Sequence, residues 1–188
     1  MRSVCQIVFM MCLLSAACSR ITGPESSEAK SFFPLAVGNT WQYKALGDGP
    51  ENRSETWIVT RQVMIEGLPY FEIEKSYSRS DIVNRDFYRA VGDQLLMIPD
   101  GSDTIQLLAD FSLKESEMFI SVTDHFVLKA FVSDWQKNKR TITYDSPEVV
   151  DEEQEISFTR GVGITSYRSL AWGVGGSLVS YDLKGKDN

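Results

Sequence analysis

Cysteine and histidine are scarce in this chain of 188 residues, which contains three cysteines and a single histidine, His125. Cys5 and Cys12 lie in an apolar N-terminal segment, so only Cys18 remains outside it and cannot form an internal disulfide. A structural zinc site needs about four nitrogen or sulfur ligands, which these residues cannot supply together. We therefore expect a fold without disulfides, metal or other cofactor, held together by its apolar core.

Long hydrophobic runs are also missing, apart from one at the N-terminus. Residues 4–14 are apolar except for Gln6, follow Arg2, and end in the small residues 15–17. The run is too short to cross a bilayer, which takes about 20 apolar residues. This pattern is typical of a secretory signal peptide, so we expect residues 1–17 to be removed on export.

The end of this segment, LSAAC at residues 14–18, resembles the lipobox of bacterial lipoproteins. In that family a cysteine after small residues receives diacylglycerol and fatty chains such as palmitate, and becomes the new N-terminus. The resemblance implies lipid attachment at Cys18, and Ser19 implies an outer-membrane location facing the periplasm or the cell surface. Ser15 stands where the family usually has leucine, and cleavage by an ordinary signal peptidase is the alternative.

Composition divides the rest of the chain into three parts. Residues 18–31 are rich in Ser, Glu and Gly, which is typical of a flexible tether behind an acylated cysteine. Residues 32–184 have the length of one domain, and residues 185–188 form a polar tail. The chain is 43% hydrophobic, so a core can be buried, and its net charge of −7 argues against nucleic acid or anionic headgroups as partners for the domain.

Apolar residues alternate with polar ones along most of the domain, which predicts half-buried β-strands. Trp57, Val59 and Val63 are expected to share one face of the first such run. In the next run Glu72 and Glu74 face away from the apolar side chains that alternate with them. Further strands are predicted at residues 86–91, 94–98, 104–109, 117–123, 126–135, 140–144, 155–160, 164–171 and 177–183.

We therefore predict a mainly β fold: an antiparallel meander that forms a curved sheet or barrel-like domain, with at most one or two short helices. A sheet of about ten strands curls or closes, because strand twist and exposed edges disfavour a flat one. An open half-barrel and a closed barrel both remain compatible with the pattern. A short helix within residues 107–119 is the main local alternative.

Two stretches resemble the opening and the closing hairpin of a group of uncharacterised bacterial envelope lipoproteins. They are FFPLAVGNTWQY at residues 32–43 and GVGITSYRSLAWGVGGSLVSYDL at residues 161–183. The resemblance implies a shared fold and location and assigns no catalytic residue. In physical terms Gly38 suits a tight turn, and Gly161 and Gly163 suit a bulge or a close approach of two backbones.

Aromatic residues that alternate along the strands are the candidates for lining a binding site, although filling the core is their default role. A curved sheet can enclose a small apolar ligand on its concave face. The candidate positions are Trp41, Tyr43, Trp57, Phe71 and Tyr77.

Residues with catalytic chemistry are isolated in this sequence. His125 has no obvious partner for a nucleophilic triad. Glu72 and Glu74 could act as the acid pair of a glycoside hydrolase, but their alternation with apolar residues is that of an ordinary solvated face. Residues 100–103 match only a fragment of a calcium loop. We therefore assign no catalytic residue and expect a protein that is not an enzyme.

Three functions remain, in order of preference. The first is a membrane-anchored envelope lipoprotein whose β domain binds an apolar ligand or a protein partner. The alternative is a structural component of an envelope complex that assembles by edge-strand pairing. The third is a hydrolase that uses surface carboxylates.

Overall fold

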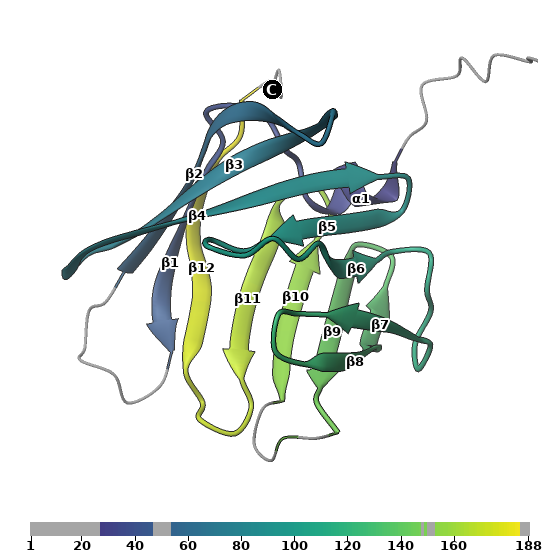
Figure 1. Ribbon diagram of the computed structural model, residues 1–188. Helices are drawn as coiled ribbons and strands as arrows, with labels where there is room; N and C mark the ends of the chain where they lie inside the picture. The colour runs from purple at the N-terminus through teal and green to yellow at the C-terminus, as the bar shows by residue number, and fades with distance from the viewer. Residues whose placement is uncertain (1–26, 47–53, 148, 150–152, 185–188) are drawn as a thin grey trace, which may run out of the picture.

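The computed structural model describes residues 27–46, 54–147, 149 and 153–184 (Figure 1). In this part of the chain one short helix precedes twelve strands, which form one antiparallel sheet in the order β6-β5-β4-β3-β2-β1-β12-β11-β10-β9-β8-β7. The helix is α1 (Glu28–Phe32), and the strands are β1 (Thr40–Leu46), β2 (Ser54–Ile65), β3 (Leu68–Tyr77), β4 (Ser80–Val91), β5 (Gln94–Ile98), β6 (Gln106–Asp110), β7 (Met118–Val122), β8 (Val127–Gln136), β9 (Lys139–Asp145), β10 (Gln154–Thr159), β11 (Gly163–Ser169) and β12 (Gly175–Asp182).

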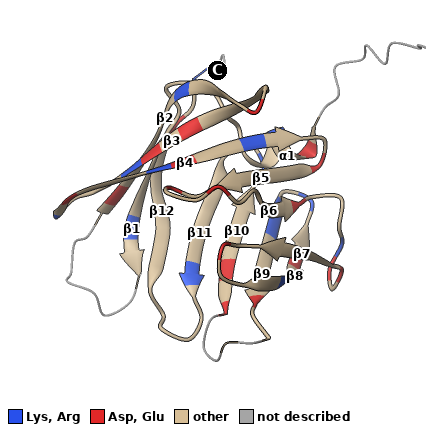
Figure 2. Ribbon diagram, viewed as in Figure 1, with Lys and Arg blue, Asp and Glu red and all other residues tan. Residues whose placement is uncertain are grey.

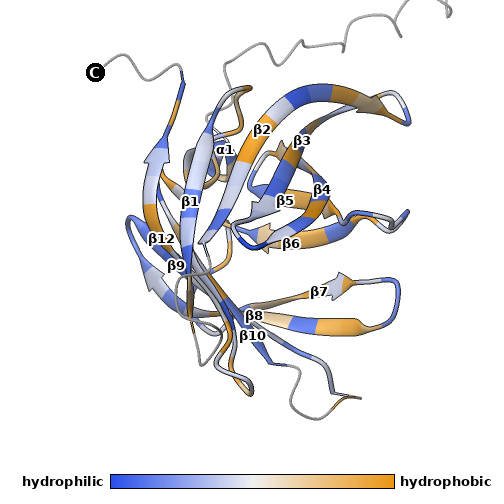
Figure 3. Ribbon diagram, turned by 90° about the vertical axis from the view of Figure 1, so that its left-hand side faces the viewer, coloured by the Kyte–Doolittle hydropathy of each residue, from blue (hydrophilic) through white to orange (hydrophobic). Residues whose placement is uncertain are grey.

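The sheet curls until it is nearly closed into a barrel, as Figure 3 shows. Strand β1 pairs with both β2 and β12 and so joins two meanders. The edge strands β6 and β7 are the two ends of the hydrogen-bonded sheet. The curl of the sheet brings them into contact with each other. The predicted antiparallel meander is confirmed. Residues 107–119 contain the end of β6, a turn and the start of β7 rather than a helix.

A β-bulge changes which side chains the end of β2 directs into the barrel. The register shifts between Val59 and Arg61, so Thr60 is an extra residue in β2. Val63 therefore lies on the outer face and not with Trp57 on the inner face, and the sequence prediction for Val63 is wrong. Alternation along one strand cannot reveal an inserted residue, because the partner strand defines the register.

Helix α1 closes one end of the barrel with aromatic side chains. The rings of Phe32 and Phe111 stack with their centroids 4.7 Å apart, and the rings of Phe33 and Trp41 stack at 5.4 Å. Phe32, Phe33 and Trp41 are fully buried. This end of the interior is therefore filled by the protein's own side chains.

The helix begins inside the segment that the sequence assigned to the tether. The hydroxyl of Ser27 caps the helix, and Glu28 forms a 2.5 Å ion pair with Arg160 of the barrel. Residues 27–31 are therefore part of the folded domain, ahead of the predicted start at residue 32. The predicted signal peptide, Cys18 and the polar tail lie outside the described residues.

The turn before β1 connects the two ends of the domain. Gly38 has a φ of +91°, in the left-handed region that favours glycine. The buried side chain of Asn39 donates a hydrogen bond to the carbonyl of Pro34 at 2.8 Å and accepts one from the backbone N–H of Lys184 at 2.7 Å. The predicted tight turn is confirmed, and it holds the chain that follows β12.

Candidate functional site

The end of the barrel opposite α1 contains a pocket of about 290 Å³. Its lining includes inward-facing side chains near the turns that join β3 to β4, β9 to β10 and β11 to β12. At about 30 Å³ per water molecule, this volume corresponds to roughly ten waters or one small ligand. The pocket is therefore at the lower end of the size range of ligand sites.

A charged pair lies on the inner face of the barrel at this pocket. The Nζ of Lys75 on β3 is 2.5 Å from a carboxylate oxygen of Asp86 on β4. The same ammonium lies 3.9 Å from the ring centroid of Trp57, and the other oxygen of Asp86 accepts the backbone N–H of Asp100 at 2.9 Å. Only 13% of the Lys75 side chain and 10% of the Asp86 side chain are exposed, so each charge depends on the other for compensation.

Glu55 on β2 is a second carboxylate in the pocket. Burial raises its pKa, and the neighbouring Trp57, Lys75 and Tyr77 lower it only in part. The hydroxyl of Tyr167 donates a hydrogen bond to Glu55, but no described basic side chain forms an ion pair with it. Glu55 is therefore a half-buried acid that forms no ion pair within the described structure.

Tyr167 owes its position to close packing around its ring. Its centroid lies 5.6 Å from that of Tyr43 and 5.7 Å from that of Trp57. A Cβ atom on Gly176 would come within 2.6 Å of the Tyr167 hydroxyl oxygen. The glycine on β12 therefore leaves the space in which Tyr167 reaches Glu55.

The indole N–H of Trp57 is an unpaired polar group at this site. It is buried and forms no hydrogen bond of ordinary geometry within the described part of the chain, although it lies close enough to the Glu55 carboxylate to lower the pKa of that group. A buried donor without a partner costs about 1–3 kcal/mol, so native proteins retain few of them. A ligand or a water molecule in the pocket would accept a hydrogen bond from this N–H group.

The opposite wall of the pocket is apolar. It includes Met97 on β5, Leu108 on β6, Leu128 on β8 and Ile156 on β10. The hydroxyl of the buried Tyr144 donates a hydrogen bond to the carbonyl of Leu108, which links β9 to the edge strand β6 across the interior. Burial also raises the pKa of Tyr144, so its hydroxyl stays protonated and remains a donor. The pocket thus combines a polar wall with an apolar one.

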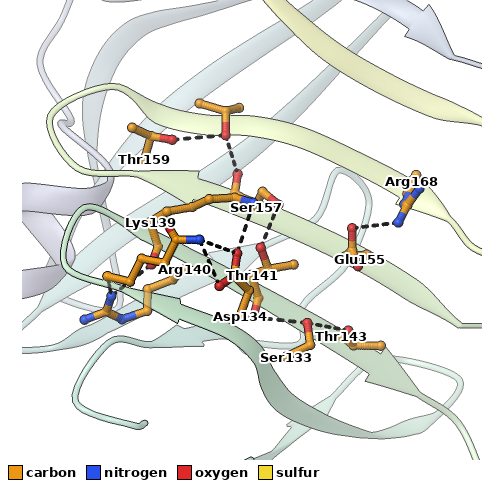
Figure 4. A network of polar contacts seen from close by, with 12 residues as sticks. Ser133, Asp134, Lys139, Arg140, Thr141, Thr143, Glu155, Ser157, Thr159 and Arg168 are labelled. Atoms are coloured by element: carbon orange, nitrogen blue, oxygen red, sulfur yellow. Dashed lines mark hydrogen bonds and ion pairs between the residues drawn. The ribbon is translucent and has the colours of Figure 1, made fainter. Parts of the chain in front are cut away.

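The rim of the pocket carries a further ion pair. Glu155 on β10 and Arg168 on β11 approach to 3.2 Å (Figure 4). The same view shows hydroxyl groups that link β9 to β10, including those of Thr141 and Ser157 at 2.9 Å. The pocket lining has two positive and three negative side chains, a net charge of −1, from Lys75, Arg168, Glu55, Asp86 and Glu155.

The five aromatic candidates fall into three different environments. Trp57 and Tyr77 line the pocket. Trp41 and Tyr43 belong to the closed core, where the Tyr43 hydroxyl donates to the carbonyl of Ile164 at 2.9 Å. Phe71 lines a separate groove near α1.

The structure separates the residues considered for catalysis. Glu72 and Glu74 share the outer face of β3 as predicted, but each binds its own arginine, Arg61 at 2.7 Å and Arg85 at 3.2 Å. Glu72 is buried rather than solvated, and the hydrogen bond from Arg61 lowers its pKa. His125 lies in the exposed turn between β7 and β8.

Residues 100–103 belong to the connection between β5 and β6, which turns at residues 100 and 101 and makes a specific contact. Ser102 donates a hydrogen bond to the carboxylate of Asp124 at 2.9 Å, and Thr104 donates to the same oxygen. These hydrogen bonds, with that of Thr104 foremost, lower the pKa of Asp124. They join the β5–β6 connection to the β7–β8 turn, beside the place where the edge strands β6 and β7 approach each other. Within the described ranges, no group of three or more potential metal-binding residues occurs.

Sequence reasoning missed the polar residues that define the pocket. Lys75 stands between Ile73 and Tyr77 on the inward-facing side of β3, and a charge on an otherwise apolar face is a signal that could have found it. Glu55 likewise precedes Trp57 by two positions on the inner face of β2. Their mutual proximity could not be found without the register between the strands.

No family model, curated protein or solved structure matches this chain. Fold and site together define a nearly closed, twelve-stranded β-barrel with a pocket that is polar on one side and apolar on the other. Among the helical residues that the structure describes, none belongs to a helix long and apolar enough to span a membrane.

Proposed function

We propose that this domain is a non-catalytic binding module that holds a small amphipathic molecule in the pocket opposite α1. The ligand would have a short apolar body and a basic amine as its head. The observation that carries this proposal is Glu55, a half-buried carboxylate that forms no ion pair with a described residue and is placed among aromatic rings.

The chemistry of the polar wall favours an amine over an acid. The rings of Trp57, Tyr77 and Tyr167 surround the region of Glu55, and aromatic faces attract ammonium groups. The ammonium of Lys75 already lies over the Trp57 ring, which shows that this face accommodates a cation. The net charge of −1 in the lining adds to this preference.

The apolar wall and the volume restrict the rest of the ligand. Leu108, Leu128 and Ile156 offer contacts to a hydrocarbon body, and each buried CH₂ contributes about 0.8 kcal/mol. A pocket of about 290 Å³ holds a short chain or one ring rather than a whole diacyl lipid. We therefore propose a small amphipathic ligand, where the sequence alone suggested only an apolar one.

In this proposal the domain is anchored in the bacterial envelope through an acylated Cys18. Support comes from the signal-peptide pattern of residues 1–17 and from the small residues before the cysteine. The intact mass of the native protein tests this part. A mass that includes residues 1–17, or an unmodified Cys18, contradicts the anchoring.

Ligand binding is tested by calorimetry and native mass spectrometry with unbranched amines, alcohols and carboxylic acids of about four to ten carbons. We expect the amines to bind best, and Glu55→Gln to weaken them by about tenfold or more. Glu74→Gln removes a carboxylate from the outer face of β3 and is the matched control. Equal binding of the acids, an equal effect of the control, or no binding in any series contradicts the proposal.

Assembly through an edge strand is the second candidate function. Among the described strands, β7 pairs with β8 alone, and Met118, Ile120 and Val122 expose a row of apolar side chains along its outer face. Exposed edges with apolar faces are typical sites for adding a strand from another chain. Hydrolysis by surface carboxylates has less support, because Glu72 and Glu74 are each bound by an arginine.

A further inference from the structure

A second and larger cavity lies at the α1 end of the barrel, away from the pocket. It is an open groove of about 620 Å³ between α1, the turn before β1, and the ends of β2, β3 and β4. The chain that follows β12 completes it through Leu183 and Lys184. None of its lining residues also lines the pocket, so the two cavities are separate sites.

The groove concentrates positive charge on an otherwise acidic protein. Its lining contains Lys30, Arg89 and Lys184 and no acidic residue, whereas the whole chain has a net charge of −7. Lys30 and Arg89 form no ion pair with a described residue, and Lys184 contacts Asp182 at 2.5 Å. Figure 2 shows basic positions on α1 and on the adjoining end of β4. The groove is therefore complementary to an anion.

Apolar side chains lie next to these charges. Leu35, Phe71 and Leu183 line the groove, and the side chain of Val37 in the neighbouring turn is 52% exposed. A free phosphate would use only the basic residues. A molecule with an anionic head and hydrocarbon chains would use both kinds of surface.

The groove also lies where the chain runs toward the proposed lipid anchor. Ser27, the first described residue, lines it. Cys18 is nine positions earlier, and nine residues can span at most about 30 Å. An acyl chain on Cys18 would therefore hold this end of the barrel within about 30 Å of the bilayer surface.

We infer that the groove docks the α1 end of the barrel on a bilayer surface that contains anionic phospholipid. Lys30, Arg89 and Lys184 bind phosphate groups, and the turn around Val37 contacts the interface. The opening of the pocket at the opposite end then faces away from that bilayer. The inference rests on the proposed anchoring for the direction of the tether, whereas the charge and the lining of the groove are independent of it.

The test uses residues 18–188 with Cys18→Ser, so that no acyl chain contributes to binding. Sedimentation with vesicles of phosphatidylethanolamine and phosphatidylglycerol is compared with sedimentation with phosphatidylcholine vesicles. We expect binding only to the anionic vesicles, and weaker binding as salt is added. Inorganic phosphate added at the same charge concentration should not displace the protein, because it offers no apolar contact.

A triple variant identifies the groove as the surface that binds. Lys30→Gln, Arg89→Gln and Lys184→Gln together should lower the partition coefficient about a hundredfold, since each basic residue near an anionic surface contributes a factor of about five. The control carries the same charge change outside the groove, at Lys44, Arg79 and Lys129. Equal loss in the control, or binding to phosphatidylcholine that matches the anionic vesicles, overturns the inference.

Orientation is measured with an environment-sensitive dye on a single introduced cysteine. A dye at Val37→Cys should shift to the blue with anionic vesicles, whereas one at Val174→Cys near the pocket end should not. A shift at Val174→Cys alone would show that the opposite end faces the bilayer and would overturn the inference. Because these vesicle experiments omit the acyl chains, their outcome is separate from the intact-mass test of Cys18.

Discussion

Lys75 and Asp86 form a 2.5 Å ion pair on the inner face of the barrel, beside the ring of Trp57. Their side chains come from the adjacent strands β3 and β4, and both are mostly buried. An ion pair in such a position adds little stability compared with apolar residues that fill the same space. Its presence therefore fits a pocket that recognises a polar group better than a core that only supports the fold.

Replacing Lys75 by methionine should destabilise the protein, because Asp86 would keep its charge without a partner. We expect Lys75→Met to lower the free energy of unfolding by about 2–3 kcal/mol. This is less than the cost of breaking a fully buried ion pair, because the pocket admits water. Urea unfolding measures the loss. The double variant Lys75→Met, Asp86→Asn should recover part of it, and a loss in the double variant that equals or exceeds the sum of the two single losses would contradict the coupling.

The half-buried Glu55 should make stability depend on pH. Burial raises its pKa above the ordinary value of 4.5, so the folded state favours the protonated acid. This stabilisation is fully present below about pH 4.5 and is lost as the pH rises through the raised pKa. Glu55→Gln should thus match the wild type in urea unfolding near pH 4 and exceed it near pH 8. A difference that does not vary with pH would show that Glu55 does not titrate in this way.

Gly163 should tolerate alanine less well than another glycine with positive φ. Its φ is +114°, and a Cβ atom would lie 3.0 Å from Nε1 of Trp41, whose ring is fixed by a 2.6 Å hydrogen bond to Val162. Gly67 has a φ of +76° with nothing near its Cβ position. We expect Gly67→Ala to cost about 1 kcal/mol and Gly163→Ala about 3 kcal/mol or more in unfolding free energy. Equal losses in the two variants would mean that small shifts of the Trp41 ring easily relieve its close contact with the new Cβ atom.

The sequence was sufficient for the fold but not for the site, and the reason is physical. Alternation within one strand depends on neighbouring residues, so the inward face of β3 and the turn at Gly38 could be predicted. The pocket depends on residues far apart in the chain, such as Glu55 and Tyr167, which meet only through strand register. A single inserted residue at Thr60 was enough to reverse the predicted face of Val63.

Helix α1 also could not be predicted from its local sequence. Its sequence, EAKSF, has the composition of the segment that was predicted to be a tether, and five residues are too few to form a stable helix alone. It forms because Phe32 stacks on Phe111 and Glu28 binds Arg160, and both partners are distant in the sequence. Composition therefore placed the start of the domain a few residues too late.

The apolar row on the outer face of β7 gives a test of assembly through this edge. Ile120 is 50% exposed on the edge strand, and lysine is a residue that natural edge strands use to prevent pairing. If the edge binds another chain, crosslinking in cells should yield reproducible complexes that Ile120→Lys loses. The matched control is Ile58→Lys, because Ile58 is 36% exposed on β2 and pairs with Thr40 of β1 on one side and with Glu74 of β3 on the other. Both variants should keep the unfolding free energy within about 0.5 kcal/mol of the wild type, since neither side chain is buried. Complexes that survive Ile120→Lys, or that both variants lose equally, would exclude the β7 edge as the site of assembly.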